Sequence, residues 1–254
     1  MVINGHEKPI TINAKTYKLY GIFHDTDFNN MPGVITIHGL PGDRVDARRM
    51  SVRISRELQK IGIPSLRMDL YASGVSNGNF AEVTMSSQIE QVKDIINYVV
   101  SNKLWNGSII LMAFSEAAKV AVEVMKDNEF VDGVIFCNGV LAKESWKNEK
   151  KINRMYKRYG NLVLDIDFGV WINKKIILES EQFIISNNDK LKNKKICGIY
   201  GTDDVLTQIT PGLLEGMGIF VHYIDGADHL FTKSIWEREL FDTIVQWLKK
   251  EYKL

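Results

Sequence analysis

Ser115 lies at the end of an apolar, strand-like run and has a small residue two positions away on each side. Residues 111–118 read Leu-Met-Ala-Phe-Ser-Glu-Ala-Ala, so these flanking residues are Ala113 and Ala117. A serine on a sharp turn between a buried strand and a helix exposes its hydroxyl as a nucleophile, and small flanking residues give such a turn room. A serine ahead of an apolar helix is equally typical of an N-cap. The segment by itself leaves nucleophile and helix cap open as alternatives.

Two later segments offer an acid and a base for such a nucleophile. Gly-Thr-Asp-Asp ends at Asp204, Gly-Ala-Asp-His ends at His229, and each follows an apolar, strand-like run. Loops at the carboxyl ends of parallel strands gather along one edge of a sheet, so residues distant in sequence can meet there. Singly, Asp204 is equally well a turn residue and His229 a surface-loop residue. Together at strand ends, the three residue types favour a catalytic triad for acyl transfer.

The segment His-Gly-Leu-Pro-Gly at 38–42 follows another strand-like run and has the composition of an oxyanion loop. During acyl transfer the carbonyl oxygen of the substrate gains negative charge, and preorganised backbone N–H groups stabilise that charge. We expect Leu40 and Glu116 to be the donors, since Pro41 has no N–H. His38 is a rival candidate for the base, but at the end of a buried strand we expect it to brace the loop through hydrogen bonds.

A third segment, 69–80, reads Asp-Leu-Tyr-Ala-Ser-Gly-Val-Ser-Asn-Gly-Asn-Phe. This D-x-x-x-x-G-x-S-x-G-x-F pattern, together with the H-G-x-x-G, small-x-S-x-small, G-x-x-D and G-A-D-H segments, resembles α/β-hydrolases of the cinnamoyl/feruloyl esterase and serine aminopeptidase-like group. Nucleophile, acid and base also follow the α/β-hydrolase chain order of Ser, Asp and His. The resemblance covers about residues 33–229 and is weakest between 140 and 187.

Five site residues are implied by this resemblance: the nucleophile Ser115, the acid Asp204, the base His229 and the backbone oxyanion donors Leu40 and Glu116. The G-x-x-D spacing selects Asp204 rather than Asp203. The chain departs from the family pattern in two ways, because alanines replace both glycines around the nucleophile and because Glu116 places a carboxylate beside it. That carboxylate would repel anionic substrates, favour the protonated form of His229, or point into solvent.

Strand-like and helix-like segments alternate along the chain after an N-terminal hairpin at 9–13 and 17–24, which predicts a parallel sheet with helices on both faces. Further strands are predicted at 33–38, 64–69, 108–113, 131–138, 195–200 and 218–224, and helices at 46–61, 86–100, 116–126 and 231–252. The expected fold class is α/β, with an α/β-hydrolase core at 1–139 and 188–254 and a small inserted cap at 140–187.

The expected cap breaks the alternation of strands and helices and is rich in aromatic residues. They are Tyr156, Tyr159, Phe168, Trp171 and Phe183. These side chains either line an acyl or aryl pocket or pack a small helical cap onto the body, and the second interpretation is favoured. Asp165 and Asp167 have no further ligands at metal-binding spacing, so we expect them to be solvated or to start a helix.

Composition narrows the class of protein further. The chain has 254 residues, a net charge of +1, 45% apolar residues and 25% charged residues, which fits an ordinary soluble domain without affinity for nucleic acid or anionic membranes. The first residues lack a long apolar signal segment, and no later run reaches the roughly 20 apolar residues that cross a bilayer, so we expect a cytoplasmic location. Cys137 and Cys197 lie in apolar runs and are expected to be reduced core residues.

The expected function is that of a serine hydrolase, which cleaves a small or medium carboxylic ester through an acyl-serine intermediate without a metal or organic cofactor. Its expected partner is a small-molecule acyl substrate, free or attached to a carrier, and the sequence leaves the oligomeric state open. One alternative is an acyltransferase or thioesterase of a biosynthetic pathway that uses the same triad. Another is a non-catalytic, ligand-binding relative whose altered serine turn marks lost activity.

Overall fold

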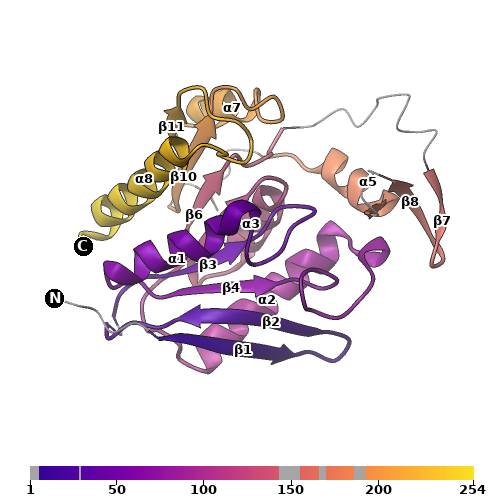
Figure 1. Cartoon of the computed structure of the whole chain (residues 1–254), viewed down its shortest axis with the longest axis horizontal. Coiled ribbons are helices and arrows are strands. Elements are labelled where there is room, and N and C mark those ends of the chain that lie inside the picture. The colour runs from indigo at the N-terminus through magenta and orange to yellow at the C-terminus, as the bar shows by residue number, and fades with distance from the viewer. Residues whose placement is uncertain (1–5, 29, 143–154, 166–169, 186–190, 192) are drawn as a thin grey trace.

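An eight-stranded sheet forms the centre of the molecule (Figure 1). The computed structural model describes residues 6–28, 30–142, 155–165, 170–185, 191 and 193–254. The strands of this sheet are β1 (Glu7–Asn13), β2 (Lys18–His24), β3 (Gly33–Ile37), β4 (Ser65–Asp69), β5 (Ile109–Phe114), β6 (Val131–Cys137), β10 (Lys195–Gly201) and β11 (Phe220–Ile224). Their order across the sheet is β1-β2-β4-β3-β5-β6-β10-β11. The pairs from β4 to β11 are parallel, whereas β2 is antiparallel to both β1 and β4.

Helices cover both faces of this sheet, as the alternating sequence pattern predicts. They are α1 (Met50–Lys60), α2 (Met85–Ser101), α3 (Ala117–Asp127), α7 (Thr210–Gly216) and α8 (Ser234–Tyr252). Apolar residues of α2, α3 and α7 belong to one core cluster, and those of α1 and α8 belong to the cluster on the opposite face. Every residue of β3, β4 and β5 is buried, which is expected for parallel strands covered on both sides. The predicted α/β fold class is therefore confirmed.

Local sequence explains where some helices begin and why the observed first residues differ from the predicted ones. Helix α2 starts behind a capping box in which Thr84 and Ser87 exchange side-chain and backbone hydrogen bonds, one residue earlier than the predicted start. Helix α1 begins at Met50 rather than at the predicted residue 46, because Arg48 and Arg49 adopt left-handed backbone angles, with φ of 54° and 63°. Helix α7 was not predicted, although its Thr-Pro start is a common helix beginning.

A second, small sheet lies between β6 and β10 in the chain. Its strands are β7 (Met155–Arg158), β8 (Asn161–Asp165) and β9 (Trp171–Asn173), and helix α5 (Lys174–Gln182) follows them. All three strands are antiparallel, so this part of the expected cap is not the helical unit that we predicted. Tyr159 and Gly160 explain the difference, since both have positive φ and close a two-residue hairpin turn. The predicted cap boundary at 187 lies outside the described residues.

The small sheet and α5 lie beyond the end of the main sheet toward which β3 and β4 point (Figure 1). A separate apolar cluster attaches them to the body. Its buried members are Val83, Leu164, Ile172, Ile176 and Ile177, and partly buried Leu40 and Tyr71 pack against it. The loops that follow β3 and β4 therefore carry the cap directly above the carboxyl ends of the strands.

The cap aromatics have different environments. Phe183 is buried in the main core cluster, whereas Tyr159 is exposed at 63%. The Arg158 guanidinium lies 4.1 Å from the centre of the Trp171 ring and 5.9 Å from that of Tyr156. Phe183 thus supports the packing interpretation, while the predicted Phe168 lies outside the described residues.

Both cysteines have the predicted environment. Cys137 and Cys197 are free thiols in the buried strands β6 and β10. Burial raises the pKa of the Cys197 thiol to about 12, which keeps it protonated and unreactive at neutral pH. Within the ranges that the structure describes, we find no helix of the length and apolarity needed to cross a membrane.

Candidate active site

Ser115 occupies a tight turn between β5 and α3. Its φ is 55°, a left-handed conformation that L-residues other than glycine adopt at a cost in free energy. Two hydrogen bonds hold the turn, since the Ser115 N–H donates to Cys137 O at 3.2 Å and the Ser115 carbonyl accepts from Val140 N at 2.9 Å. The buried alanines at 113 and 117 fit the turn without opening it. The strand-turn-helix geometry expected of a nucleophile is therefore present despite the missing glycines.

The Ser115 hydroxyl points to a histidine rather than to the backbone of the following helix. Ser115 Oγ lies 2.9 Å from His229 Nε2, and His229 Nδ1 lies 2.7 Å from Asp204 Oδ2. Because a carboxylate only accepts hydrogen bonds, the proton belongs on Nδ1 and Nε2 is left as the acceptor for the serine hydroxyl. The structure thus brings together the three residues that the sequence selected, in the arrangement of a catalytic triad.

Asp204 is held in its place by more than the histidine. It is 2% exposed, and its carboxylate also accepts from Thr207 Oγ1 at 2.6 Å and from Leu206 N at 2.9 Å. Burial alone would raise its pKa, but the hydrogen bonds from His229, Thr207 and Leu206 outweigh burial and lower the pKa below its usual value. Its neighbour Asp203 is exposed, in agreement with the G-x-x-D spacing that selected Asp204.

His38 has the bracing position that we expected for it. It is buried, and its Nε2 accepts a hydrogen bond from Leu70 N at 3.2 Å. Nδ1 therefore carries the proton and lies 2.9 Å from Gly39 O. Both ring nitrogens are engaged with the loops after β3 and β4, and His38 makes no hydrogen bond to Ser115 among the described contacts.

The loop after β3 packs tightly against the serine turn. A Cβ atom at Gly39 would lie 3.2 Å from the Cβ of Ser115 and 3.1 Å from the Phe114 ring, so a side chain there would push the loop away. Among the described residues, neither Leu40 N nor Glu116 N donates a hydrogen bond to another protein group. Both N–H groups are thus available to an oxyanion, as the predicted role requires.

The third sequence motif ties the loops around the site together. The Asp69 carboxylate accepts from Arg44 N at 2.8 Å and from Val75 N at 2.9 Å, and it pairs with the Arg44 guanidinium. A Cβ at Gly74 would lie 2.2 Å from this carboxylate, and φ at Gly74 is 52°, so only glycine fits there. The D-x-x-x-x-G spacing thus fixes the loop after β4 to the loop after β3, which contains Leu40.

Asn138 is a residue of this site that the sequence analysis missed. Its side chain is fully buried at the end of β6, where Oδ1 accepts from Gly201 N at 2.8 Å. Its Nδ2 lies 2.9 Å from His229 O and 3.2 Å from Asp228 O. Asn138 therefore connects the strand that carries Asp204 to the loop that carries His229. A polar residue directly after the apolar run 134–137 was the available signal.

Lys119 and Ser180 were also missed, and they decide where the Glu116 side chain points. Lys119 Nζ lies 2.9 Å from Glu116 Oε2 and 2.6 Å from Ser180 Oγ of helix α5. The carboxylate of Glu116, the residue before α3, thus forms an ion pair with the first turn of that helix, which none of the three expected arrangements included. The i, i+3 spacing of Glu116 and Lys119 was the signal in the sequence.

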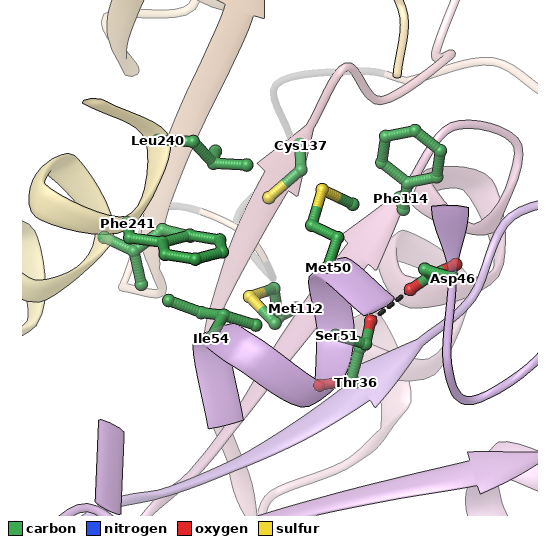
Figure 2. A pocket seen from close by; sticks show the side chains of 11 residues that line it. Thr36, Asp46, Met50, Ser51, Ile54, Met112, Phe114, Cys137, Leu240 and Phe241 are labelled. Carbon is green, nitrogen blue, oxygen red and sulfur yellow. Dashed lines mark hydrogen bonds between the residues drawn. The ribbon is translucent and has the colours of Figure 1, made fainter. Parts of the chain in front are cut away.

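A small cavity lies behind the turn, between β3, β5, β6, α1 and α8 (Figure 2). Its volume is about 20 Å³, and its lining is mostly apolar, with Phe114, Met112 and Cys137 on the sheet side and a Ser51–Asp46 hydrogen bond at one end. A space of this size holds at most a single water molecule, so it is too small to bind an organic ligand.

Metal ligation was not expected at this site. In the described parts of the chain, no group of three or more His, Cys, Asp or Glu side chains could hold a metal ion. Asp165 ends strand β8 and its carboxylate accepts a hydrogen bond from Tyr156 Oη at 3.2 Å, whereas Asp167 lies outside the described residues.

Sheet order, serine turn and strand-end loops together define the α/β-hydrolase fold, and solved structures agree. Est1E from Butyrivibrio proteoclasticus with bound ferulic acid aligns with a TM-score of 0.76 and 14% identity, over 96% of this chain and 100% of that chain. The esterase Pf2001 from Pyrococcus furiosus aligns with a TM-score of 0.71 and 18% identity, over 97% and 91% of the two chains. The α/β hydrolase GrgF from a Penicillium species aligns with a TM-score of 0.74 and 14% identity, over 96% and 98%.

Sequence comparison adds no closer relationship. No protein-family model and no curated protein matches the chain. At the identities of these solved structures, the similarity establishes the fold, and the chemistry has to be argued from the site.

Proposed function

We propose that this protein is a serine hydrolase that cleaves a small or medium carboxylic ester through an acyl-serine intermediate. The observation that carries the proposal is the hydrogen-bonded series Ser115 Oγ, His229 Nε2 and Nδ1, and Asp204 Oδ2, with distances of 2.9 Å and 2.7 Å. A non-catalytic relative would have no need for a serine in a left-handed turn that faces a correctly oriented imidazole.

In the acylation step, His229 Nε2 takes the hydroxyl proton as Ser115 Oγ attacks the ester carbonyl carbon. The ionised Asp204 stabilises the resulting imidazolium. Negative charge on the former carbonyl oxygen is stabilised by the N–H groups of Leu40 and Glu116. His229 then gives the proton to the leaving alkoxide, and the acyl group remains on Ser115.

In the second step, His229 removes a proton from water as the water oxygen attacks the acyl-serine carbonyl. Collapse of this second tetrahedral intermediate breaks the bond to Ser115 Oγ, and His229 returns a proton to that oxygen. The products are a carboxylic acid and the free enzyme. No step needs a metal or organic cofactor.

Two structural neighbours support an ester as the substrate. Pf2001 is described as an esterase, and Est1E contains ferulic acid, an aromatic carboxylic acid. We extend this to the present chain as part of the proposal, with a small-molecule acyl substrate.

Covalent labelling tests the proposal directly. A fluorophosphonate probe should add to Ser115 of the wild-type protein, and the adduct should be absent from Ser115→Ala when both are analysed by intact mass and peptide mapping. Labelling that persists in Ser115→Ala would disprove the assignment of the nucleophile.

Acyl esters and thioesters then identify the reaction. Wild-type protein incubated with a panel of both should release free acid, with a transient mass increase equal to that of the acyl group. Transfer of the acyl group to an added alcohol at the expense of hydrolysis would instead establish the acyltransferase alternative, and a preference for thioesters would establish a thioesterase.

A further inference from the structure

Lys119 is a buried cation directly behind the serine turn. Its side chain is 1% exposed, and its Nζ lies 2.9 Å from Glu116 Oε2 and 2.6 Å from Ser180 Oγ. Glu116 follows the nucleophile, and Ser180 belongs to helix α5 of the cap. One ammonium group therefore contacts both the serine turn and the cap.

Stability alone does not account for this cation. Lys119 is the third residue of α3, where the positive end of the helix dipole disfavours a positive charge. Removing an ammonium from water adds a further cost, and well-packed apolar residues commonly replace buried ion pairs without loss of stability. A site that departs from such rules is expected to have a functional reason.

The contact with Glu116 reaches the chemistry through the backbone of that residue. In the proposed mechanism, Glu116 N stabilises the oxyanion, and the orientation of this N–H depends on the peptide plane between Ser115 and Glu116. The carboxylate of Glu116 is anchored at Oε2, while its Oε1 is buried without a hydrogen-bond partner in the described part of the chain. Oε2 also accepts a hydrogen bond from Ser180 Oγ at 3.4 Å, so Lys119 and Ser180 together hold this partly buried carboxylate.

From these contacts we propose that Lys119 is a positioning residue that latches the cap helix to the serine turn and fixes the oxyanion donor of Glu116. The inference rests on the proposed serine hydrolase function. We call the contacts of Lys119 with Glu116 and Ser180 the latch.

The neighbouring residue of α5 provides a matched control. The Glu179 carboxylate accepts from Met85 N at 2.7 Å, from Ser86 N at 3.3 Å and from Ser86 Oγ at 2.6 Å. This second attachment joins the same cap helix to the start of α2 and does not contact the serine turn. Loss of Glu179 should therefore loosen the cap while leaving the Glu116 side chain anchored.

The experiment compares Lys119→Met, Ser180→Ala and Glu179→Ala with the wild-type protein. It measures the rate of fluorophosphonate labelling, kcat and KM for a small ester such as p-nitrophenyl acetate, and hydrogen exchange of residues 174–182. Lys119→Met keeps the apolar stem of the side chain. The double variant Lys119→Met with Glu116→Gln also removes the uncompensated carboxylate, and it replaces the single variant if that fails to fold.

We expect faster exchange in residues 174–182 for Lys119→Met, Ser180→Ala and Glu179→Ala, because each variant removes one attachment of α5. The labelling rate and kcat should fall about tenfold in Lys119→Met and in the double variant, with little change in KM, because an oxyanion donor acts mainly in the transition state. Ser180→Ala should lie between Lys119→Met and wild type, and Glu179→Ala should label within about twofold of wild type.

Wild-type labelling rates in both Lys119 variants would overturn the proposal, and so would equal losses in Ser180→Ala and Glu179→Ala. Failure of the proposed function is distinguishable from these results, because the wild-type protein would then not be labelled at all. In that case unchanged exchange of residues 174–182 in Lys119→Met would still disprove the latch. Faster exchange would support the attachment of α5 to the serine turn by Lys119.

Discussion

Asp204 shows how neighbouring groups set the ionisation state of a buried carboxylate. Its carboxylate is almost completely buried, which alone would favour the neutral acid. Hydrogen bonds from His229, Thr207 and Leu206 lower its pKa instead, so the carboxylate is ionised when it is needed beside an imidazolium. The exposed Asp203 has none of this environment, although it is the adjacent residue of the same type.

Replacing the two aspartates separately tests this difference. Asp204→Asn should reduce kcat by on the order of 10³- to 10⁴-fold, since an amide can donate to Nδ1 and thereby favour the wrong imidazole tautomer. Asp203→Asn should change kcat less than about twofold, because an exposed side chain outside the triad has no part in orienting it. Steady-state kinetics on one ester substrate measures both, and a larger loss for Asp203→Asn would transfer the role of acid to that residue.

Asn138 acts on the triad through backbone groups, and a prediction follows from its contacts. Asn138→Ala should leave Gly201 N, Asp228 O and His229 O without their buried partner, at a cost of about 1–3 kcal/mol in unfolding free energy. We also expect a fall in kcat that exceeds any change in KM, because the base loop is no longer fixed. Urea denaturation and kinetics measure the two effects. Wild-type stability together with wild-type kcat would refute this role.

Among the secondary-structure elements, the carboxyl ends of β5, β10 and β11 carry Ser115, Asp204 and His229, so the distances between the loops that follow them determine the candidate site. The loops after β10 and β11 approach closely at Gly201, where an added Cβ would lie 2.2 Å from Ala227 O. Since this contact involves backbone, a side chain at residue 201 can be accommodated only if the two loops separate. Such a separation would change the distance between Asp204 and His229.

A pair of glycine substitutions tests the importance of this approach. Gly201→Ala should lower both Tm and kcat, because the acid and base loops move apart. Gly212→Ala is the matched control, since nothing lies within 4 Å of the added Cβ and the residue is inside helix α7. It should leave kcat unchanged and stabilise the protein by about 0.5–1 kcal/mol through helix propensity. Thermal unfolding measures Tm and steady-state kinetics measures kcat for both variants. Equal changes in Tm and kcat for the two variants would argue against a tight contact between the loops.

The whole fold also contains a buried histidine far from the site in sequence. His24 ends β2 with no exposed surface, and its Nε2 accepts a hydrogen bond from Arg67 Nε at 2.9 Å. Burial, reinforced by the nearby Arg67 charge, lowers the pKa of His24 from 6.5 to about 4. The folded protein therefore keeps this histidine neutral at pH values where the unfolded chain protonates it.

This difference predicts how acid affects the stability of the fold. Between pH 6.5 and about 4 the unfolded state binds a proton that the folded state does not. The free energy of unfolding should therefore decrease by up to about 3 kcal/mol as the pH is lowered through this range. Above pH 6.5 this residue has no effect, because both states are neutral. His24→Gln keeps an acceptor for Arg67 but does not titrate, so its stability should fall less steeply. Denaturation at several pH values tests this, with exposed His6→Gln as a control that should match wild type.

The sequence determined the features that depend on local residue type and on order along the chain. Alternation of apolar strands and amphipathic helices gave the α/β class, because burial on one or both faces leaves its own period in the sequence. Ser115, Asp204 and His229 were selected for a related reason, since each lies in a segment that follows a strand, and parallel strands collect their carboxyl ends at one edge. Helix starts were least well predicted, as the left-handed backbone at Arg48 and Arg49 before α1 shows.

Only the tertiary structure decided which side chains meet across long distances in sequence. Asn138 acquires its role because β6 lies beside β10 and because the base loop folds over both, and Ser180 meets Lys119 across 61 positions. The sequence predicts a helical cap where the structure has a short antiparallel sheet, because such a sheet depends on pairing between strands rather than on a local period. Tertiary packing also decided that the Glu116 side chain lies against Lys119. The spacing of the two residues in the sequence permits this ion pair, but the burial of Lys119 depends on the surrounding fold.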